Sequence, residues 1–353
     1  VIAACGILAF YAVLMGWTGH TLFHALLVGL PVDINAANTF FESISGGNSA
    51  LLGQLLSLVL TALVVGAGVQ GGIERLSRWS LPLLFLLLLI LSVWASTLPG
   101  AFEGYRDFLL RFEMQQLFSP TTIRYAFEQA FFSIGTGIGC ILAYAAYLDR
   151  RNHLPREAVA VVGMDTAVGL LAGMVTFPVV MSFGLKGLIN ESTVGTLFIA
   201  LPTGLSSLGT TGRLVAVLFF SLAYIAAITS SVSLLEVPVA SLMDRLGWSR
   251  TRAVWLSMGL IFVAGLPAVK YEAALDFMIS VFGGVLLVLG GLLLALLLGW
   301  VVPRRLDDDL ANCETPKGVR RWLRFMLRWV SPPVIAFGLI VSVVDLVQKW
   351  FVT

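Results

Sequence analysis

Nine apolar segments of about 20 residues or more run through this chain, and each is long enough to cross a lipid bilayer as a helix. Charged residues make up 12% of the sequence, whereas a soluble domain carries roughly twice that fraction. The sequence therefore predicts an all-α integral membrane protein, folded as one transmembrane domain over residues 1–353. The expected spans cover approximately residues 1–30, 51–70, 79–98, 121–148, 157–184, 213–241, 251–269, 275–302 and 329–352.

The basic residues indicate the orientation, because Lys and Arg collect in cytoplasmic loops. Across nine alternating spans, fifteen of them fall on one side and seven on the other. We therefore expect a multi-pass protein of the plasma (inner) membrane that starts on the cytoplasmic side. The net charge of +2 reflects this bias and predicts no nucleic-acid partner. The chain begins inside apolar sequence without a Met, and from this we expect an N-terminal truncation.

The fourth span contains three alternating glycines, Gly135, Gly137 and Gly139. Each glycine inside a helix costs about 1 kcal/mol relative to alanine, and a backbone group freed in lipid costs more unless it finds a partner. One interpretation is a helix broken at membrane depth, which is how secondary transporters expose carbonyl groups to cations. The alternative is that Gly135 and Gly139, four residues apart, form a close contact between intact helices. The glycines alone do not choose between these two.

Two polar points lie within other spans. Asp165 needs a cation, a proton or a hydrogen-bond network, because a carboxylate at the centre of a membrane helix costs roughly 2.5–3.5 kcal/mol. Ala226, Thr229 and Ser230 are spaced so that one carbonyl and two hydroxyls can converge. Hard cations such as sodium bind several oxygen ligands of this kind. The alternative is that the hydroxyls bond back to their own helix.

Two connecting segments are also distinctive. Residues 185–212 are too long and too apolar for a plain connector, and they indicate a cap of short helices on the extracellular side. Residues 303–322 are rich in charge and are interpreted as a solvated loop.

The remaining candidates for chemistry are few. His20 and His24 share a helix face, but three dispersed histidines in the whole chain make a zinc cluster improbable. Asp165 and Glu236 are the only candidate acid–base pair within the spans, and they lie on separate helices. An enzyme is therefore disfavoured.

Four short motifs stand in order along the chain. They are Phe10-Tyr11 with Gly16-Trp17, then Gly72-Ile73-Glu74-Arg75, then Gln129-Ala130-Phe131-Phe132-Ser133 with Gly137 and Gly139, and then Ala226-x-x-Thr229-Ser230-Ser231. In this order and spacing the chain resembles the neurotransmitter:sodium symporters, a family with the LeuT-type inverted-repeat fold. The match covers the family's third to eleventh spans, so we expect the first two spans to be absent.

The resemblance implies the substrate-binding residues. Tyr11 would donate its hydroxyl to the substrate carboxylate, and Phe132 would cover the pocket. The other residues implied around the substrate are Ser133, Gly135, Ile138, Ser230 and Leu234.

The resemblance also implies two sodium sites and two gates. Ser133 and Asp165 match ligands of the sodium ion that touches the substrate. The ligands of the second sodium would be Ala226, Thr229 and Ser230. Gln129 and Asp276 would form the outer gate, and Tyr147 and Asp244 the inner one.

The implied function is sodium-coupled symport of an amino acid by alternating access. Many relatives have asparagine at the position of Asp165, so we expect this carboxylate to supply the negative charge that otherwise comes from chloride. Gly135, Ile138 and Leu234 favour a hydrophobic or aromatic amino acid. The alternative is a truncated remnant or a structural membrane protein without transport activity, because the first span would supply about half of the site. The sequence does not fix the oligomeric state.

Overall fold

The computed structural model describes residues 1–145, 154–184, 193–313 and 315–352, which form helices and short connections. Eight helical runs in these residues are long and apolar enough to cross a membrane. They are Ile2–Leu27, Gly47–Gly66, Val69–Ser96, Leu154–Ser182, Gly209–Leu246, Arg250–Lys270, Glu272–Val301 and Lys317–Trp350. The prediction of an all-helical protein is confirmed. The observed helices extend beyond several expected spans, because polar end residues continue the same helices.

The fourth expected span, 121–148, is the one not among these eight, and its described part is divided into two helices. The first part is α7 (Pro120–Ile134) and the second is α8 (Cys140–Ala145), separated by residues 135–139. Helix α7 has 15 residues and is too short to cross a bilayer alone, since a helix needs about 20 residues to do so. The predicted break is therefore present in the fold.

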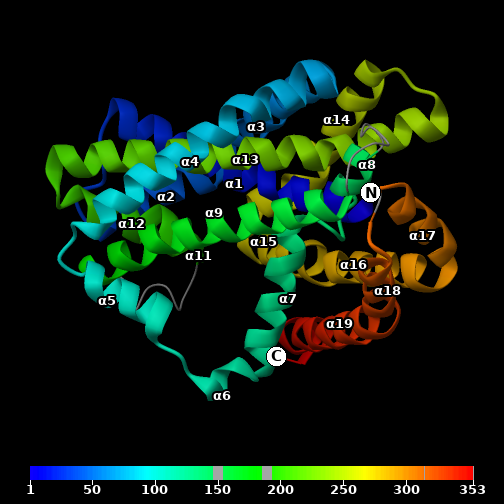
Figure 1. Cartoon of the computed structure of the whole chain (residues 1–353). Helices are drawn as coiled ribbons and strands as arrows, with labels where there is room; N and C mark the ends of the chain where they lie inside the picture. Colours follow the sequence, from blue (N-terminus) through cyan, green and yellow to red (C-terminus); the bar gives the residue numbers. More distant parts are fainter. Residues whose placement is uncertain (146–153, 185–192, 314, 353) are drawn as a thin grey trace.

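The elements follow one another along the chain in Figure 1. The longer ones are α1 (Ile2–Leu27), α2 (Ile34–Ser45), α3 (Gly47–Gly66), α4 (Arg75–Ser96), α9 (Leu154–Ser182), α13 (Gly209–Leu246), α14 (Arg250–Lys270), α16 (Leu286–Leu296), α17 (Pro303–Asn312), α18 (Lys317–Phe325) and α19 (Ser331–Val347). Short helices are α5 (Ala101–Tyr105), α6 (Met114–Leu117), α11 (Thr193–Gly195), α12 (Leu201–Ser206) and α15 (Glu272–Met278). Segments of π-helix are Val69–Glu74, Arg106–Leu110, Thr196–Ala200, Ile279–Val285, Leu297–Val301, Met326–Val330 and Gln348–Val352.

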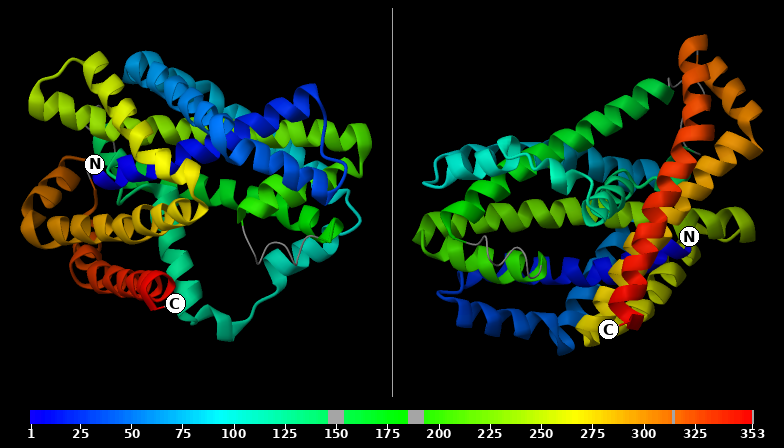
Figure 2. Two further views of the ribbon diagram at one scale, coloured as in Figure 1. Left: turned by 180° about the vertical axis from the view of Figure 1, so that it is seen from behind. Right: turned by 90° about the horizontal axis from the view of Figure 1, so that it is seen from below.

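The interpretation of residues 303–322 as a loop is wrong. This segment forms α17 and the first part of α18, and α18 continues into α19 as one long helix, seen from below in the right-hand view of Figure 2. Arg324 of α18 forms an ion pair with Asp307 of α17. Opposite charges on the two helices thus pair with each other, and a count of charges along the sequence does not distinguish such pairing from exposure to solvent. In the expected cap, the described part does consist of short helices, α11 and α12.

Helix α1 lies at the centre of the main bundle, where it packs against α3, α13 and α14. Helices α4 and α9 pack on each other, and α4 also packs on α13. A second group consists of α16 and α19. Helix α7 contacts α9 on one side and α16 and α19 on the other, and Figure 1 shows it crossing between the two groups. The broken helix therefore sits between the two parts of the fold.

Local sequence explains where α7 begins and ends. The Ser119 side chain accepts a hydrogen bond from the Thr122 amide at 3.2 Å, and Pro120 occupies the first helical position. Both are favoured at a helix N-terminus. At the other end, Gly135 has φ = +71°, and Gly139 has φ = +95° just before α8 begins. Residues with a Cβ rarely adopt this conformation, so the two glycines permit the chain to leave and re-enter the helix.

Gly137 has a different role, because it lies directly against the backbone of α16. A Cβ placed on Gly137 would collide with the carbonyl oxygen of Leu287 and would lie 3.0 Å from the Gly291 nitrogen. At Gly135, by contrast, a Cβ would meet nothing within 4 Å. The close contact between helices is therefore made by Gly137, and the alternative based on Gly135 and Gly139 is not what the structure shows.

Helix α13 is fixed by a buried ion pair. The Glu236 carboxylate is fully buried, and it accepts hydrogen bonds from both terminal nitrogens of Arg250, at the start of α14. The Nε of Arg250 donates to the carbonyl oxygen of Val65 in α3 at 2.8 Å. One guanidinium group thus joins three helices, and its planar donors match the carboxylate geometry.

Replacing Glu236 by alanine should destabilise the protein by about 3–5 kcal/mol, because it leaves the largely buried Arg250 guanidinium without its carboxylate. Thermal unfolding in detergent measures this loss. Glu74→Ala is the matched control, since it removes the partner of Arg78 in an ion pair that is exposed to solvent. Equal melting temperatures for the two variants would contradict the role of the buried pair.

Replacing Gly137 by valine should destabilise the protein by about 1–3 kcal/mol, because the side chain must push the break away from α16. Gly135→Asn is the control: asparagine tolerates the left-handed conformation, and this position has open space. We expect a lower melting temperature for Gly137→Val than for Gly135→Asn. The reverse order would show that Gly137 does not make a tight contact.

Candidate functional site

The described residues of the predicted site come from five helices and from the break. Tyr11 lies on α1, Asp165 on α9 and Asp276 on α15. Helix α7 carries Gln129, Phe132 and Ser133, and Gly135 and Ile138 lie in the break itself. Helix α13 carries Ala226, Thr229, Ser230, Leu234 and Asp244. Tyr147 lies outside the described residues.

Ser133 and Asp165 meet directly. The Ser133 hydroxyl, one turn before the break, donates a hydrogen bond to the Oδ1 atom of Asp165. This bond joins α7 to α9 and partly satisfies the carboxylate that the sequence marks as costly. A carboxylate and a hydroxyl at the end of an interrupted helix supply oxygen ligands of the kind that hard cations bind.

A second contact joins Tyr11 to Ser230. The Tyr11 side chain lies near the Ser230 side chain, where α1 packs against α13. The resemblance implies substrate binding for both residues, and the structure brings them together.

Thr229 and Ala226 are adjacent, as their spacing predicts. The Thr229 hydroxyl donates to the carbonyl oxygen of Ala226 at 2.8 Å. This is the bond back to the same helix that the sequence leaves open as an alternative. It also places two of the three expected sodium ligands side by side, so a cation at this position would replace the hydroxyl proton as the partner of the carbonyl oxygen.

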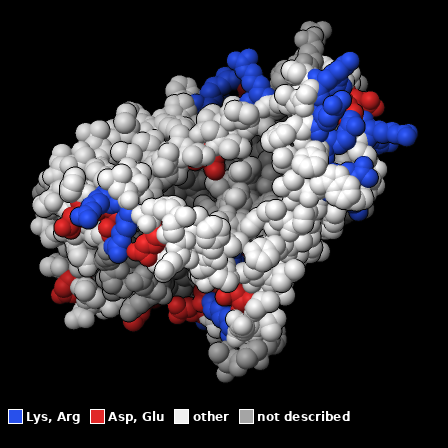
Figure 3. Space-filling view, turned by 60° about the horizontal axis from the view of Figure 1, so that its bottom comes forward, with Lys and Arg blue, Asp and Glu red and all other residues white. Residues whose placement is uncertain are grey.

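The residues that the resemblance implies around the substrate differ in polarity and exposure. Ile138 and Leu234 are buried, with 6% and 5% of their surface exposed. Phe132 is 39% exposed, and Ser133 and Ser230 are also exposed. Figure 3 shows a hollow in the middle of one face of the molecule, with atoms of an Asp or Glu residue, drawn in red, at its edge.

The predicted gates are less complete. Asp276 forms an ion pair with Lys349 at 3.5 Å, and no hydrogen bond joins it to Gln129 in the part of the chain that the structure describes. Gln129 lies on an exposed face of α7, and Asp244 is exposed near the end of α13. The pairing of Gln129 with Asp276 stays a prediction.

The sequence analysis did not identify a polar cluster between α7 and α19. Ser342 donates to the Glu128 carboxylate at 3.0 Å, and Arg124 forms an ion pair with Asp345. Arg124 and Glu128 are four residues apart, which places them on one face of α7. Two charged residues at this spacing inside an apolar span could have predicted the cluster from the sequence.

His20 and His24 use their ring nitrogens for backbone contacts. The Nε2 atom of His20 lies 3.0 Å from the carbonyl oxygen of Ser49, and the Nδ1 atom of His24 lies 2.9 Å from that of Gly29. The two carbonyl oxygens lie in separate segments, so each ring stabilises a different part of the backbone near α1.

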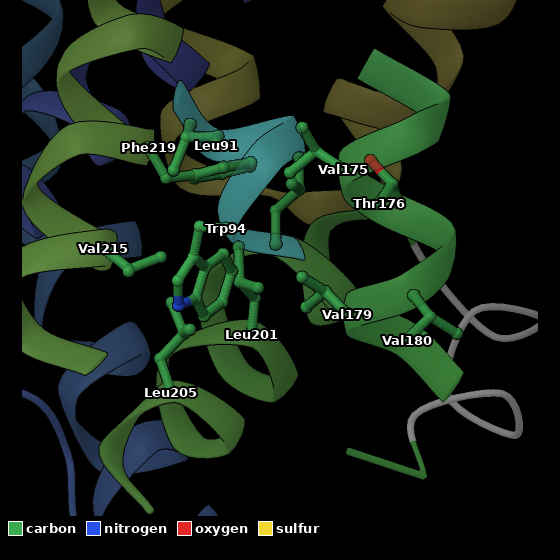
Figure 4. A pocket seen from close by; sticks show the side chains of 11 residues that line it. Leu91, Trp94, Val175, Thr176, Val179, Val180, Leu201, Leu205, Val215 and Phe219 are labelled. Carbon is green, nitrogen blue, oxygen red and sulfur yellow. The ribbon is translucent and has the colours of Figure 1, made fainter. Parts of the chain in front are cut away.

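An apolar cavity of about 40 Å³ lies apart from these residues, among α4, α9, α12 and α13. Figure 4 shows Trp94, Val179, Leu201 and Phe219 among the side chains around it. It contains none of the predicted site residues. Its volume is far below the several hundred Å³ of a typical small-molecule pocket, so it is a packing defect of the core.

Comparisons with known proteins agree with this arrangement. A sodium-dependent transporter of Haemophilus influenzae is 28% identical over 95% of this chain, which spans 76% of that protein. The sodium-dependent transporter YhdH of Bacillus subtilis is 38% identical over 75% of this chain, which spans 58% of that protein. The crystal structure of MhsT in complex with L-phenylalanine superposes with a TM-score of 0.85 at 32% identity, covering 97% of this chain and 79% of MhsT.

MhsT has the LeuT-type fold, so the expected fold class is confirmed. The similar proteins are transporters, and the enzyme alternative is set aside. The pattern that defines the sodium:neurotransmitter symporter family matches residues 42–352. The chain therefore belongs to the sodium:neurotransmitter symporter family.

Proposed function

We propose that this protein couples the entry of sodium to the uptake of a hydrophobic or aromatic amino acid by alternating access. The observation that carries the proposal is the hydrogen bond between Ser133 and Asp165 at the edge of the break. It brings a hydroxyl and a carboxylate from two helices to the place where the backbone of α7 leaves its helix. Family membership supports sodium as the co-transported ion.

The substrate class follows from the walls of the break. Buried Ile138 and Leu234 present apolar surface, and Gly135 leaves room because a Cβ there would meet nothing within 4 Å. A large apolar side chain fits such a space better than the hydrogen of glycine. The similar structure of MhsT in complex with L-phenylalanine supports the same class.

The coupling would arise because one sodium ion shares its surroundings with the substrate. In this proposal Ser133 and Asp165 hold the first ion, and Tyr11 donates its hydroxyl to the substrate carboxylate. Ala226, Thr229 and Ser230 hold the second ion. When ion and substrate bind next to each other, each raises the affinity for the other by the same factor.

Movement between the two open states would pass through the gates. In this proposal Gln129 and Asp276 close the outer side, and Tyr147 and Asp244 close the inner side. In this proposal the protein resides in the plasma (inner) membrane. The positive-inside rule then places the basic residues of α17 and α18 on its cytoplasmic side.

The chain spans 58% of YhdH, and the alternative proposal is a remnant or structural membrane protein that does not transport. Uptake by cells that express the complete gene, including any in-frame upstream sequence, separates the two possibilities. Sodium-dependent accumulation of L-phenylalanine is expected. Accumulation equal to that of cells with an empty vector would favour the remnant.

Replacing both Thr229 and Ser230 by alanine should raise the sodium concentration for half-maximal L-phenylalanine binding by about tenfold or more, which corresponds to about 1.4 kcal/mol. Scintillation proximity binding over a sodium series measures this. Ser231→Ala is the control, because Ser231 lies on the same turn but is buried against Thr61. An unchanged sodium series in the double variant would remove the cation assignment.

Because Asp165 would supply the negative charge beside sodium, uptake should persist when gluconate replaces chloride. Asp165→Asn should weaken the sodium response about tenfold or more, as expected when a charged ligand is lost. Asp309→Asn, which changes an exposed carboxylate on α17, should leave the response unchanged. Loss of wild-type uptake in gluconate would reject the role of Asp165 as counter-charge.

A further inference from the structure

Helix α8, the second half of the broken helix, is tied to α13 by side-chain hydrogen bonds. The Tyr144 hydroxyl donates to the Ser233 hydroxyl oxygen at 2.8 Å. The thiol of Cys140, at the start of α8, lies 3.4 Å from the Ser233 carbonyl oxygen. Both contacts converge on one residue of α13. Ile141 and Leu142, between them in sequence, are exposed, so the face of α8 that contains Tyr144 is the one that packs.

The same residue of α13 leads to the proposed second sodium site. The Ser233 hydroxyl donates to the carbonyl oxygen of Thr229 at 3.1 Å, and the Thr229 hydroxyl donates to that of Ala226 at 2.8 Å. Hydrogen bonds from α8 thus reach the Thr229 backbone through Ser233, and the hydroxyl of the same Thr229 bonds to the Ala226 carbonyl oxygen, the second oxygen group proposed to bind the ion. The segment of α13 from residue 226 to residue 233 therefore contains both the proposed sodium ligands and the residue that contacts α8.

Helix α13 is held firmly just beyond this point. Glu236 lies three residues after Ser233 and is fixed by Arg250, which also binds the Val65 carbonyl oxygen. Helix α8 has no comparable ion pair among its described residues, and it is preceded by the glycine break. A change at the turn of residues 226–233 is therefore transmitted more readily to α8 than to α14 or α3.

We infer that Tyr144 is a positioning residue that couples ion binding at Ala226 and Thr229 to the placement of α8. The inference rests on the proposed function and adds a residue to it. An ion that orders the 226–233 turn stabilises the arrangement in which Ser233 receives the Tyr144 hydroxyl. By linkage, the Tyr144 bond in turn stabilises the turn that binds the ion.

The experiment compares Tyr144→Phe with wild type in binding of L-phenylalanine over a sodium series, using protein expressed from the complete gene. Phenylalanine keeps the ring and removes only the hydroxyl. A hydrogen bond contributes about 0.5–1.5 kcal/mol, so the half-maximal sodium concentration should rise about 3- to 10-fold. Ser233→Ala should give a similar rise, and the double variant should be little worse than either single one, because both remove the same bond.

Thr61→Val is the matched control. Thr61 forms a 2.8 Å hydrogen bond with Ser231, on the same part of α13, and both side chains are buried. This bond leads to α3 and does not touch the broken helix. Thr61→Val should lower the melting temperature while leaving the sodium series within about twofold of wild type. If Tyr144 had a purely structural role, Tyr144→Phe would likewise lower the melting temperature and leave the half-maximal sodium concentration within about twofold of wild type.

Amide hydrogen exchange gives a second readout. Sodium should slow exchange at residues 140–145 in wild type and not in Tyr144→Phe. An unchanged sodium series and unchanged protection in Tyr144→Phe would overturn the inference while leaving the proposed function intact. A wild-type protein that binds L-phenylalanine equally with and without sodium would instead overturn the proposed function, and the inference with it.

Discussion

The site depends on the contact between the glycine break and helix α16. Gly137 lies against the backbone of Leu287 and Gly291 at a distance that no side chain would allow. Because the break is seated there, α7 can stop at Ile134 and present Ser133 to Asp165. Freed backbone groups are costly in a membrane unless they line a polar site or pack against protein. The break meets both conditions.

Helix α13 provides the fixed frame against which this break is placed. Its 38 residues span the molecule, and the buried pair of Glu236 and Arg250 connects it to α14 and α3. Thr229, Ser230 and Ser233 lie within two turns of this anchor. Tyr11 and Tyr144 approach the same stretch from α1 and α8. Polar residues of α13 are therefore in contact with four neighbouring helices, α1, α3, α8 and α14, near the proposed ion and substrate sites.

Much of the fold could be predicted from local patterns. Length and hydropathy identify the spans, and the energetic cost of Gly135, Gly137 and Gly139 in a helix made a break one of two interpretations. The helical pair α17 and α18 was missed, because a charge-rich segment gives the same signal whether its charges meet water or each other. The pairing of Arg324 with Asp307 depends on how the two helices lie in space, which spacing along the chain does not contain.

The candidate site also contains some contacts that the sequence predicts and others that it does not. Spacing within one helix was sufficient to group Ala226 with Thr229, and the family motifs placed Asp165 with Ser133. Contacts between distant helices, such as Glu128 with Ser342, needed the structure. The division of roles among the three glycines also needed it, since φ angles and packing distances distinguish Gly137 from its neighbours.

In the proposed function, the break forms a chamber shared by sodium and a large apolar amino acid. The decisive measurement is equilibrium binding of radiolabelled L-phenylalanine to the purified protein, in sodium chloride and in potassium chloride of equal ionic strength. We expect saturable binding in sodium that is lost in potassium. Equal binding in the two salts would contradict it.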